Sequence, residues 1–105
     1  MSRSESLAAY LRAQAWRRLD RVESKDEGRN ARTALALLDT AAYAARLPDD
    51  DPLILMLDQA GCFGPLGCEG FDPGEAGNRL VRHWQGGEPH ELLLALPSAI
   101  ATAGQ

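Results

Sequence analysis

The chain has little lysine, cysteine, histidine or aromatic character. Its 105 residues contain one lysine beside ten arginines, two cysteines, two histidines and six aromatic side chains. Two cysteines cannot build a framework of several disulfides. No run approaches the roughly 18 apolar residues that a membrane-spanning helix needs, and the first apolar stretch is interrupted by Arg12. We therefore expect no signal peptide, no membrane contact and a cytoplasmic protein whose cysteines stay reduced.

The charge of the chain is unevenly distributed. Residues 1–25 carry six basic and three acidic side chains, residues 26–105 carry five basic and twelve acidic ones, and the net charge is −4. Nucleic acid is an unexpected partner, because domains that bind it are usually strongly basic. The positive first segment suits the acidic body, a second copy of the chain or another polyanion. The excess of arginine over lysine, with abundant alanine, glycine and leucine, indicates a bacterial gene of high GC content.

The first predicted helix runs from about Ser4 to Glu23. It follows a capping box in residues 2–5, with Ser4 or Ser6 as alternative caps. Apolar residues recur at intervals of three and four and predict one buried face: Leu7, Ala8, Leu11, Ala15, Leu19 and Val22. Trp16 falls outside that face, near Arg12 and Arg17. These three residues, Arg12, Trp16 and Arg17, are our candidate interaction surface, because an exposed tryptophan is typical of a contact with a partner.

The second predicted helix runs from about Asn30 to Leu47, after a turn near Gly28, and Pro48 ends it. Its predicted main apolar stripe consists of Ala31, Ala34, Leu35, Leu38, Ala42 and Ala45. Three further residues widen that stripe: Leu37, Ala41 and Ala44. So much alanine allows a close approach between helices.

Three shorter helices are predicted in the second half of the chain. The first begins at Pro52 with Asp51 as its N-cap and ends before Gly61. It is apolar nearly all round, so it should be central and well buried. The next begins with an N-cap at Asp72 and runs to about residue 85. The last opens at residues 88–91 and is kinked or ended by Pro97.

The whole chain therefore predicts one all-α domain over residues 1–105, with about five helices and frayed ends at 1–3 and 104–105. A long antiparallel helix pair is joined by three shorter helices, and a glycine-rich connector separates the third helix from the fourth. The few β-branched residues do not alternate, so no strand is predicted.

The glycine-rich connector at residues 61–72 is the least ordinary segment. It holds both cysteines, and glycines recur there at every third residue, at Gly61, Gly64, Gly67 and Gly70. Such a loop suits the close approach of a ligand. Our candidate ligand pocket beneath it consists of Tyr43, Met56, Cys62, Phe63, Cys68, Phe71, His83 and Trp84. The alternative is that these aromatic side chains belong to the core.

The four cysteine and histidine residues form the only candidate metal set. Cys62, Cys68, His83 and His90 suit zinc by number, but their spacing does not match that of structural zinc sites. We therefore expect no cofactor, with zinc as an alternative. A disulfide or a catalytic thiol is disfavoured, and free cysteines that pack as small apolar residues are the preferred interpretation.

Two functions from different classes remain. The first is a small cytosolic interaction or accessory module without catalysis of its own, which self-associates through the alanine-rich second helix and the Trp16 face. The second is a small-molecule-binding protein or accessory enzyme of bacterial metabolism with a pocket under the 61–72 loop. The first is preferred, since no catalytic motif is present.

Overall fold

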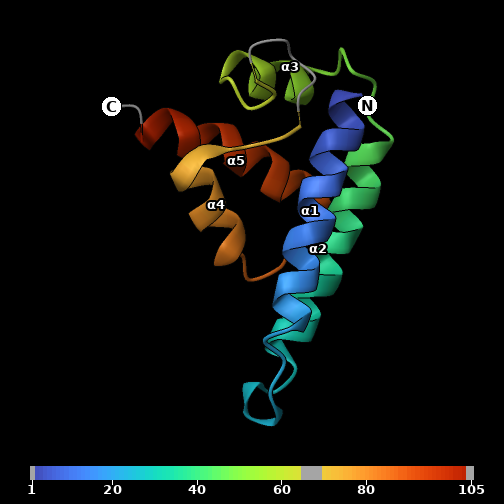
Figure 1. Cartoon of the computed structure of the whole chain (residues 1–105), viewed down its shortest axis with the longest axis vertical. Helices are drawn as coiled ribbons and strands as arrows, with labels where there is room; N and C mark the ends of the chain where they lie inside the picture. The colour runs from blue at the N-terminus through green and yellow to red at the C-terminus, as the bar shows by residue number, and fades with distance from the viewer. Residues whose placement is uncertain (1, 65–69, 104–105) are drawn as a thin grey trace.

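A computed structural model describes residues 2–64 and 70–103, and over these residues the protein is entirely helical. The elements, in chain order, are α1 (Arg3–Leu19), a 3-10 turn η1 (Ser24–Asp26), α2 (Arg29–Ala45), α3 (Pro52–Gln59), α4 (Gly74–Arg82) and α5 (Pro89–Ala103). The predicted all-α class and long antiparallel pair are confirmed. Figure 1 shows α1 and α2 side by side along the long axis, with α3 across one end and α4 and α5 beside them.

The inner faces of α1 and α2 form the centre of the core. On α1 the predicted stripe is correct for Leu7, Ala8, Leu11 and Ala15, which are all fully buried. Leu19 is half-buried, and Val22 is 48% exposed because the helix ends before it. On α2 the buried residues are Thr33, Ala34, Leu37, Thr40, Ala41 and Ala44. Alanine on both helices lets the two backbones lie close together.

The main stripe predicted for α2 is wrong in its rotation about the helix axis. Leu35 is 61% exposed, and Ala42 and Ala45 also face solvent. The three residues that were expected only to widen the stripe, Leu37, Ala41 and Ala44, are buried, whereas Ala34 is the one residue of the predicted main stripe that is fully buried. Two adjacent apolar stripes run along α2, and packing against α1 and α5 covers only one of them.

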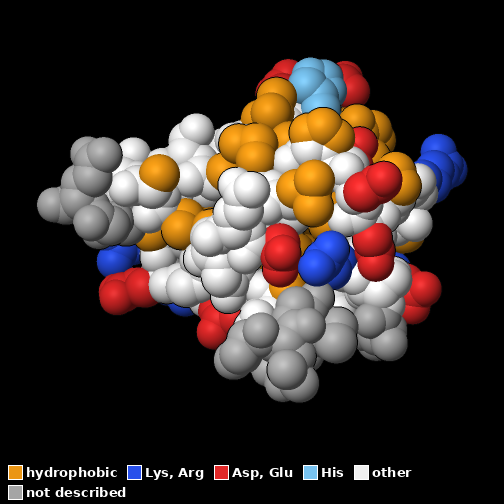
Figure 2. Space-filling model, turned by 90° about the horizontal axis from the view of Figure 1, so that it is seen from above, with side chains coloured by type: hydrophobic (Ala, Val, Ile, Leu, Met, Phe, Trp, Pro, Cys, Tyr) orange, Lys and Arg blue, Asp and Glu red, His pale blue; other side chains and the backbone are white. Residues whose placement is uncertain are grey.

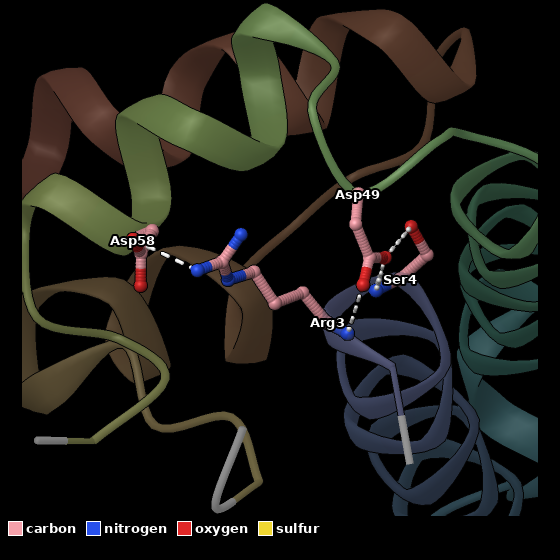
Figure 3. A network of polar contacts seen from close by, with 4 residues as sticks. All are labelled: Arg3, Ser4, Asp49 and Asp58. Atoms are coloured by element: carbon pink, nitrogen blue, oxygen red, sulfur yellow. Dashed lines mark hydrogen bonds and ion pairs between the residues drawn. The ribbon is translucent and has the colours of Figure 1, made fainter. Parts of the chain in front are cut away.

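The N-terminus of α1 is held by the linker that follows α2 (Figure 3). Asp49 accepts hydrogen bonds from the backbone N–H groups of Arg3 and Ser4, at 3.3 and 3.2 Å. A carboxylate there also meets the positive end of the helix dipole. The Arg3 guanidinium forms an ion pair with Asp58 on α3, at a distance of 3.4 Å. Ser2 is the N-cap predicted by the capping box, and its hydroxyl accepts from the N–H of Glu5.

A polar turn at Asp26 joins α1 to α2. Asp26 accepts from the backbone N–H groups of Glu23 and Gly28 and from the side chain of Asn30. These bonds lower the pKa of Asp26, the bond from Glu23 contributing most. Because the chain turns to reach this carboxylate, α1 ends at Leu19 and not near residue 23.

The start and end signals predicted for α3 are confirmed. The Asp51 side chain accepts from the N–H of Leu53, with Pro52 in the first turn. At the other end Gly61 has a φ of 84°, and the N–H groups of Gly61 and Cys62 bond back to Asp58 and Leu57. This is a Schellman motif, and it buries Cys62 and Phe63 beneath the helix.

The expectation that α3 is buried nearly all round is wrong. Ile54 and Leu57 are fully buried, whereas Leu55 and Met56 are 39% and 45% exposed. A helix of eight residues at one end of the molecule has neighbours on one side only. Figure 2, which looks down on this end, shows hydrophobic side chains gathered over part of the surface.

The starts and ends of α4 and α5 differ from the prediction. Asp72 accepts from the N–H of Gly74, so α4 begins two residues after Asp72, and it ends at Arg82. Gly77 is buried against Pro73, where a methyl group would lie 2.3 Å from the proline Cβ. Pro97 does not end α5, which continues through it to Ala103, since Leu96, Pro97 and Ile100 pack into the core.

Candidate functional site

The outer stripe of α2 is an apolar surface that the packing of the described helices leaves partly open. We define it by five residues: Ala31, Leu35, Leu38, Ala42 and Ala45. Leu35, Ala42 and Ala45 are exposed, and Ala31 and Leu38 are half-buried. None of the five side chains can hydrogen bond to water, so burial of this stripe against another apolar surface is favourable.

The outer stripe has the spacing of a coiled-coil seam. Ala31, Leu38 and Ala45 are seven residues apart, and Leu35 and Ala42 lie between them, again seven apart. This is a continuous a/d heptad pattern over the whole helix. The next residue after each member of the first set is charged, in the order Arg32, Asp39, Arg46. All three charged residues are exposed, so one edge of the stripe carries alternating charge.

Trp16 is 62% exposed on α1. Its level along the hairpin follows from two contacts between the helices, Ser4 to Leu47 and Arg18 to Asn30. In that antiparallel register Trp16 lies level with the part of α2 that contains Leu35.

The three residues of the predicted interaction surface do not share one face of α1. Arg12 is exposed one helical turn before Trp16, on the same side of α1. Arg17 lies on another side, where it lines a crevice toward α4. The candidate surface is therefore Trp16 with Arg12.

The predicted pocket residues are divided among several places. Cys62 and Phe71 line a hollow of about 620 Å³ together with Gly61, Gly64 and Gly70. Phe63 is fully buried below them, and its ring contacts that of Phe71 at 5.3 Å between centroids. Phe71 also contacts the ring of Tyr10 at 5.0 Å. Part of this prediction, Cys68, lies outside the described residues.

The remaining pocket residues lie elsewhere. His83 and Trp84 line a second hollow of about 530 Å³ beside α4, together with Leu80. Tyr43 and Met56 are 37% and 45% exposed, and neither lines either hollow. The structure thus joins Cys62 to Phe71 and His83 to Trp84, but not the two pairs to each other.

The candidate zinc set is also divided. Cys62 is a buried free thiol, whereas His83 and His90 are exposed beyond the end of α4 and at the start of α5. Within residues 2–64 and 70–103, no three His, Cys, Asp or Glu side chains are grouped to hold a metal ion. Burial, assisted by the charge of Asp72, raises the pKa of Cys62 to about 11, so this thiol is protonated at neutral pH.

Sequence reasoning missed the position of Arg18. Its guanidinium donates to the backbone carbonyl of Trp84 at 2.6 Å and to Asn30 at 3.2 Å, so one α1 side chain joins α4 and α2. The only sequence signal was the density of arginine near the end of the first helix. Which arginine turns inward depends on where α4 packs.

Comparisons with known proteins give no relative of this chain. No protein-family model matches it, and no curated protein or solved structure is significantly similar to it. Across the part of the chain that the structure describes, no helix is long and apolar enough to span a membrane. A function must therefore be inferred from the surfaces themselves.

Proposed function

We propose that this protein is a non-enzymatic interaction module that self-associates through the outer stripe of α2. The observation that carries the proposal is an apolar heptad seam on α2 in which Leu35, Ala42 and Ala45 are exposed, while Ala31 and Leu38 are half-buried. A second copy of the chain is the occupant that fits best, because the same stripe is self-complementary when two copies meet around a two-fold axis.

Alanine at three of the five seam positions favours a close pair of helices. Small side chains let two α2 backbones approach, while Leu35 and Leu38 supply the larger apolar contacts. The 17 residues of α2 give a seam of about 25 Å, at 1.5 Å per residue. The Leu35 side chain is 61% exposed in one copy, so its burial between two copies removes apolar surface from water.

The charged edge of the seam favours an antiparallel arrangement. A two-fold axis halfway between Arg32 and Asp39 places each Arg32 opposite the partner's Asp39. A two-fold axis halfway between Asp39 and Arg46 instead places each Asp39 opposite the partner's Arg46. Either register gives two opposite-charge contacts, and charges beside a coiled-coil seam set the orientation of the helices. In this proposal Trp16 and Arg12, which are exposed on α1, also take part in the contact between the copies.

The proposed setting is the bacterial cytoplasm. The free thiol of Cys62 agrees with a reducing compartment. The bacterial origin rests on the excess of arginine over lysine in the sequence.

The proposal is tested by the mass of the protein in solution. Sedimentation or native mass spectrometry over a concentration series should give twice the 11.3 kDa mass of the chain at high concentration. Leu35→Glu should return the protein to a monomer, because it places a carboxylate in the seam. Leu94→Glu is the matched control, since Leu94 on α5 is 51% exposed and should tolerate the same change. A monomer at every concentration up to the millimolar range would refute the proposal.

The antiparallel geometry has a separate test. Asp39→Arg leaves only positive charge along the edge and should weaken the dimer by about tenfold or more. The triple variant Arg32→Asp, Asp39→Arg, Arg46→Asp inverts every charge but keeps the alternation, so it should dimerise like the native chain. Failure of the triple variant to recover would exclude the antiparallel charge pairing.

A further inference from the structure

The hollow beside α4 has an apolar wall that is built at helical spacing. Ala76 and Leu80 lie one turn apart on α4, and Trp84 follows one turn later, just beyond the end of the helix. All three residues are half-buried, and Leu80 and Trp84 also pack against the core. The volume of the hollow, about 530 Å³, lies within the range of small-molecule sites. The outer stripe of α2 does not line it.

The indole of Trp84 is held in place and presents carbon atoms to the hollow. Its Nε–H is closed to solvent and has no hydrogen-bond partner among the described residues, so the part of the ring that meets the hollow is apolar. Arg18 on α1 donates to the Trp84 carbonyl at 2.6 Å, and the Trp84 N–H donates to the carbonyl of Val81. A methyl group at Gly87 would lie 3.5 Å from the indole, so the turn after Trp84 also packs against the ring. A wall that is fixed beforehand lowers the ordering cost of binding.

The rim of the hollow carries positive charge. Its polar side chains, Arg79, His83 and Gln85, are all exposed. No carboxylate of the described residues lines the hollow, although the chain has 15 acidic and 11 basic side chains. Arg79 forms an ion pair with Glu75 at 3.1 Å, but the two side chains are 66% and 88% exposed. A surface pair of this kind contributes little to stability, so Arg79 can exchange Glu75 for another anion at small cost.

We propose that the hollow beside α4 binds a small aromatic carboxylate, with its ring against Leu80 and Trp84 and its carboxylate at Arg79. An aromatic ring packs favourably against an indole, and a guanidinium accepts both oxygens of a carboxylate in one planar pair. A phosphate monoester fits less well, because the apolar wall offers its oxygens no hydrogen-bond donors. The hollow is open to solvent on one side, so we expect a dissociation constant of about 1 mM or somewhat lower for a ligand of this size.

Titration with indole-3-acetate and indole-3-acetamide tests the site directly, because the two probes share a ring and differ in charge. The methyl signals of Leu80 and the two indole N–H signals are followed by NMR at constant protein concentration and ionic strength. Indole-3-acetate should give saturable shifts at Leu80 and Trp84 and none at Trp16, which is the internal control. The amide should bind at the same place but about fivefold more weakly, since it lacks the charge that pairs with Arg79.

Three results of this titration would overturn the proposal. The first is the absence of shifts at Leu80 and Trp84 at concentrations well above the expected dissociation constant. The second is equal affinity for the acid and the amide, which would remove the role of Arg79. The third is a change of the same signals on dilution of the protein without any probe, which would show that a second copy of the chain fills the hollow.

A set of single variants separates the rim from bulk charge. Arg79→Gln should lower the affinity for indole-3-acetate to that for the amide and leave amide binding unchanged, which also shows that the apolar wall is intact. Glu75→Gln should raise the affinity for the acid about twofold, because the guanidinium loses its competing partner. Arg12→Gln removes the same charge as Arg79→Gln from an exposed position on α1 and should change the affinity less than twofold. Equal weakening by Arg79→Gln and Arg12→Gln would refute a carboxylate site at Arg79.

Discussion

Arginine lies at both ends of the α1–α2 hairpin, but among the described residues only the α3 end places an arginine of α1 within ion-pair distance of a carboxylate. At the α3 end, Arg3 pairs with Asp58, and Asp49 accepts from the first N–H groups of α1. At the η1 end, Arg18 bonds only to neutral acceptors, and Arg17 and Arg21 have no ion pair with any described residue. The first end explains how the helix pair is held together. The second carries charge whose purpose the fold alone does not explain.

The same contrast occurs around α2. Its inner stripe is fully covered, from Ala34 through Leu37 to Ala44, whereas its outer stripe leaves Leu35 61% exposed. In both comparisons one region is complete, in the sense that its charges are paired or its apolar side chains are covered within one chain. A similar region close to it is not complete in this sense. Completed regions are structural, and the incomplete ones are where a partner or ligand is to be sought. The following substitutions test whether the two kinds of region really differ.

The largest effect is expected when the two stripes of α2 are compared by leucine truncation. Leu37→Ala should lower the free energy of unfolding by about 2–5 kcal/mol, because it leaves a cavity in the closed core. Leu35→Ala should cost less than about 0.5 kcal/mol in dilute protein, since its side chain already meets water. Urea unfolding at concentrations where the protein is monomeric measures both. Equal losses would mean that the outer stripe is part of the core and is not a free surface.

A smaller effect on stability is expected at the α3 end of the hairpin, where Asp49 accepts from the first N–H groups of α1. Asp49→Asn weakens the capping of α1 and should cost about 1 kcal/mol. The bonds from Ser4 and Arg3 lower the pKa of Asp49, the backbone bond from Ser4 contributing most. Its contribution is therefore present above the unfolded-state pKa of about 3.9 and is lost as the pH falls through the lower folded-state pKa.

Urea unfolding of the native protein and the Asp49→Asn variant between pH 2 and 7 tests both parts of this prediction. The two stabilities should converge as the pH falls through the folded-state pKa. Asp50→Asn is the control, because Asp50 is an exposed carboxylate next to Asp49 in the same linker. A constant difference across the acid range would show that the charge of Asp49 is not what stabilises the helix.

Local signals in the sequence predicted most of the fold. The N-caps at Ser2 and Asp51 and the C-terminal glycine at Gly61 are set by residues within one turn of each helix end, so they could be identified without tertiary knowledge. The rotation of α2 could not, because two apolar stripes lie side by side and only contact with α1 and α5 selects one. Of the two outcomes predicted at Pro97, a kink or an end of the helix, the end is wrong for a related reason, since tertiary packing outweighs the hydrogen bond that proline removes.

The candidate sites were less predictable than the fold. The residues grouped by sequence around the glycine-rich loop come from four places, so proximity to the loop in the sequence did not mean proximity in space. The crevice that Arg17 lines exists because the end of α1 meets Arg82 of α4, more than 60 residues away. The sequence placed Trp16 outside the buried face of the first helix but left open whether it packs within the chain, and the structure shows it to be exposed.

The smallest effect, but the one with the most informative sign, is expected at Arg21. Arg21→Gln removes a like charge near Arg18 and should raise the free energy of unfolding by a few tenths of a kcal/mol in buffer of low salt. The gain should fade at 0.5 M chloride, where the repulsion is screened. Arg12→Gln removes an exposed charge of α1 and should give no comparable gain. A loss of stability for Arg21→Gln would mean that the η1 end, like the Asp49 end, already has its charges balanced, and the contrast between the two ends would disappear. A gain in stability on removal of Arg21 is what unrelieved repulsion between its charge and that of Arg18 predicts.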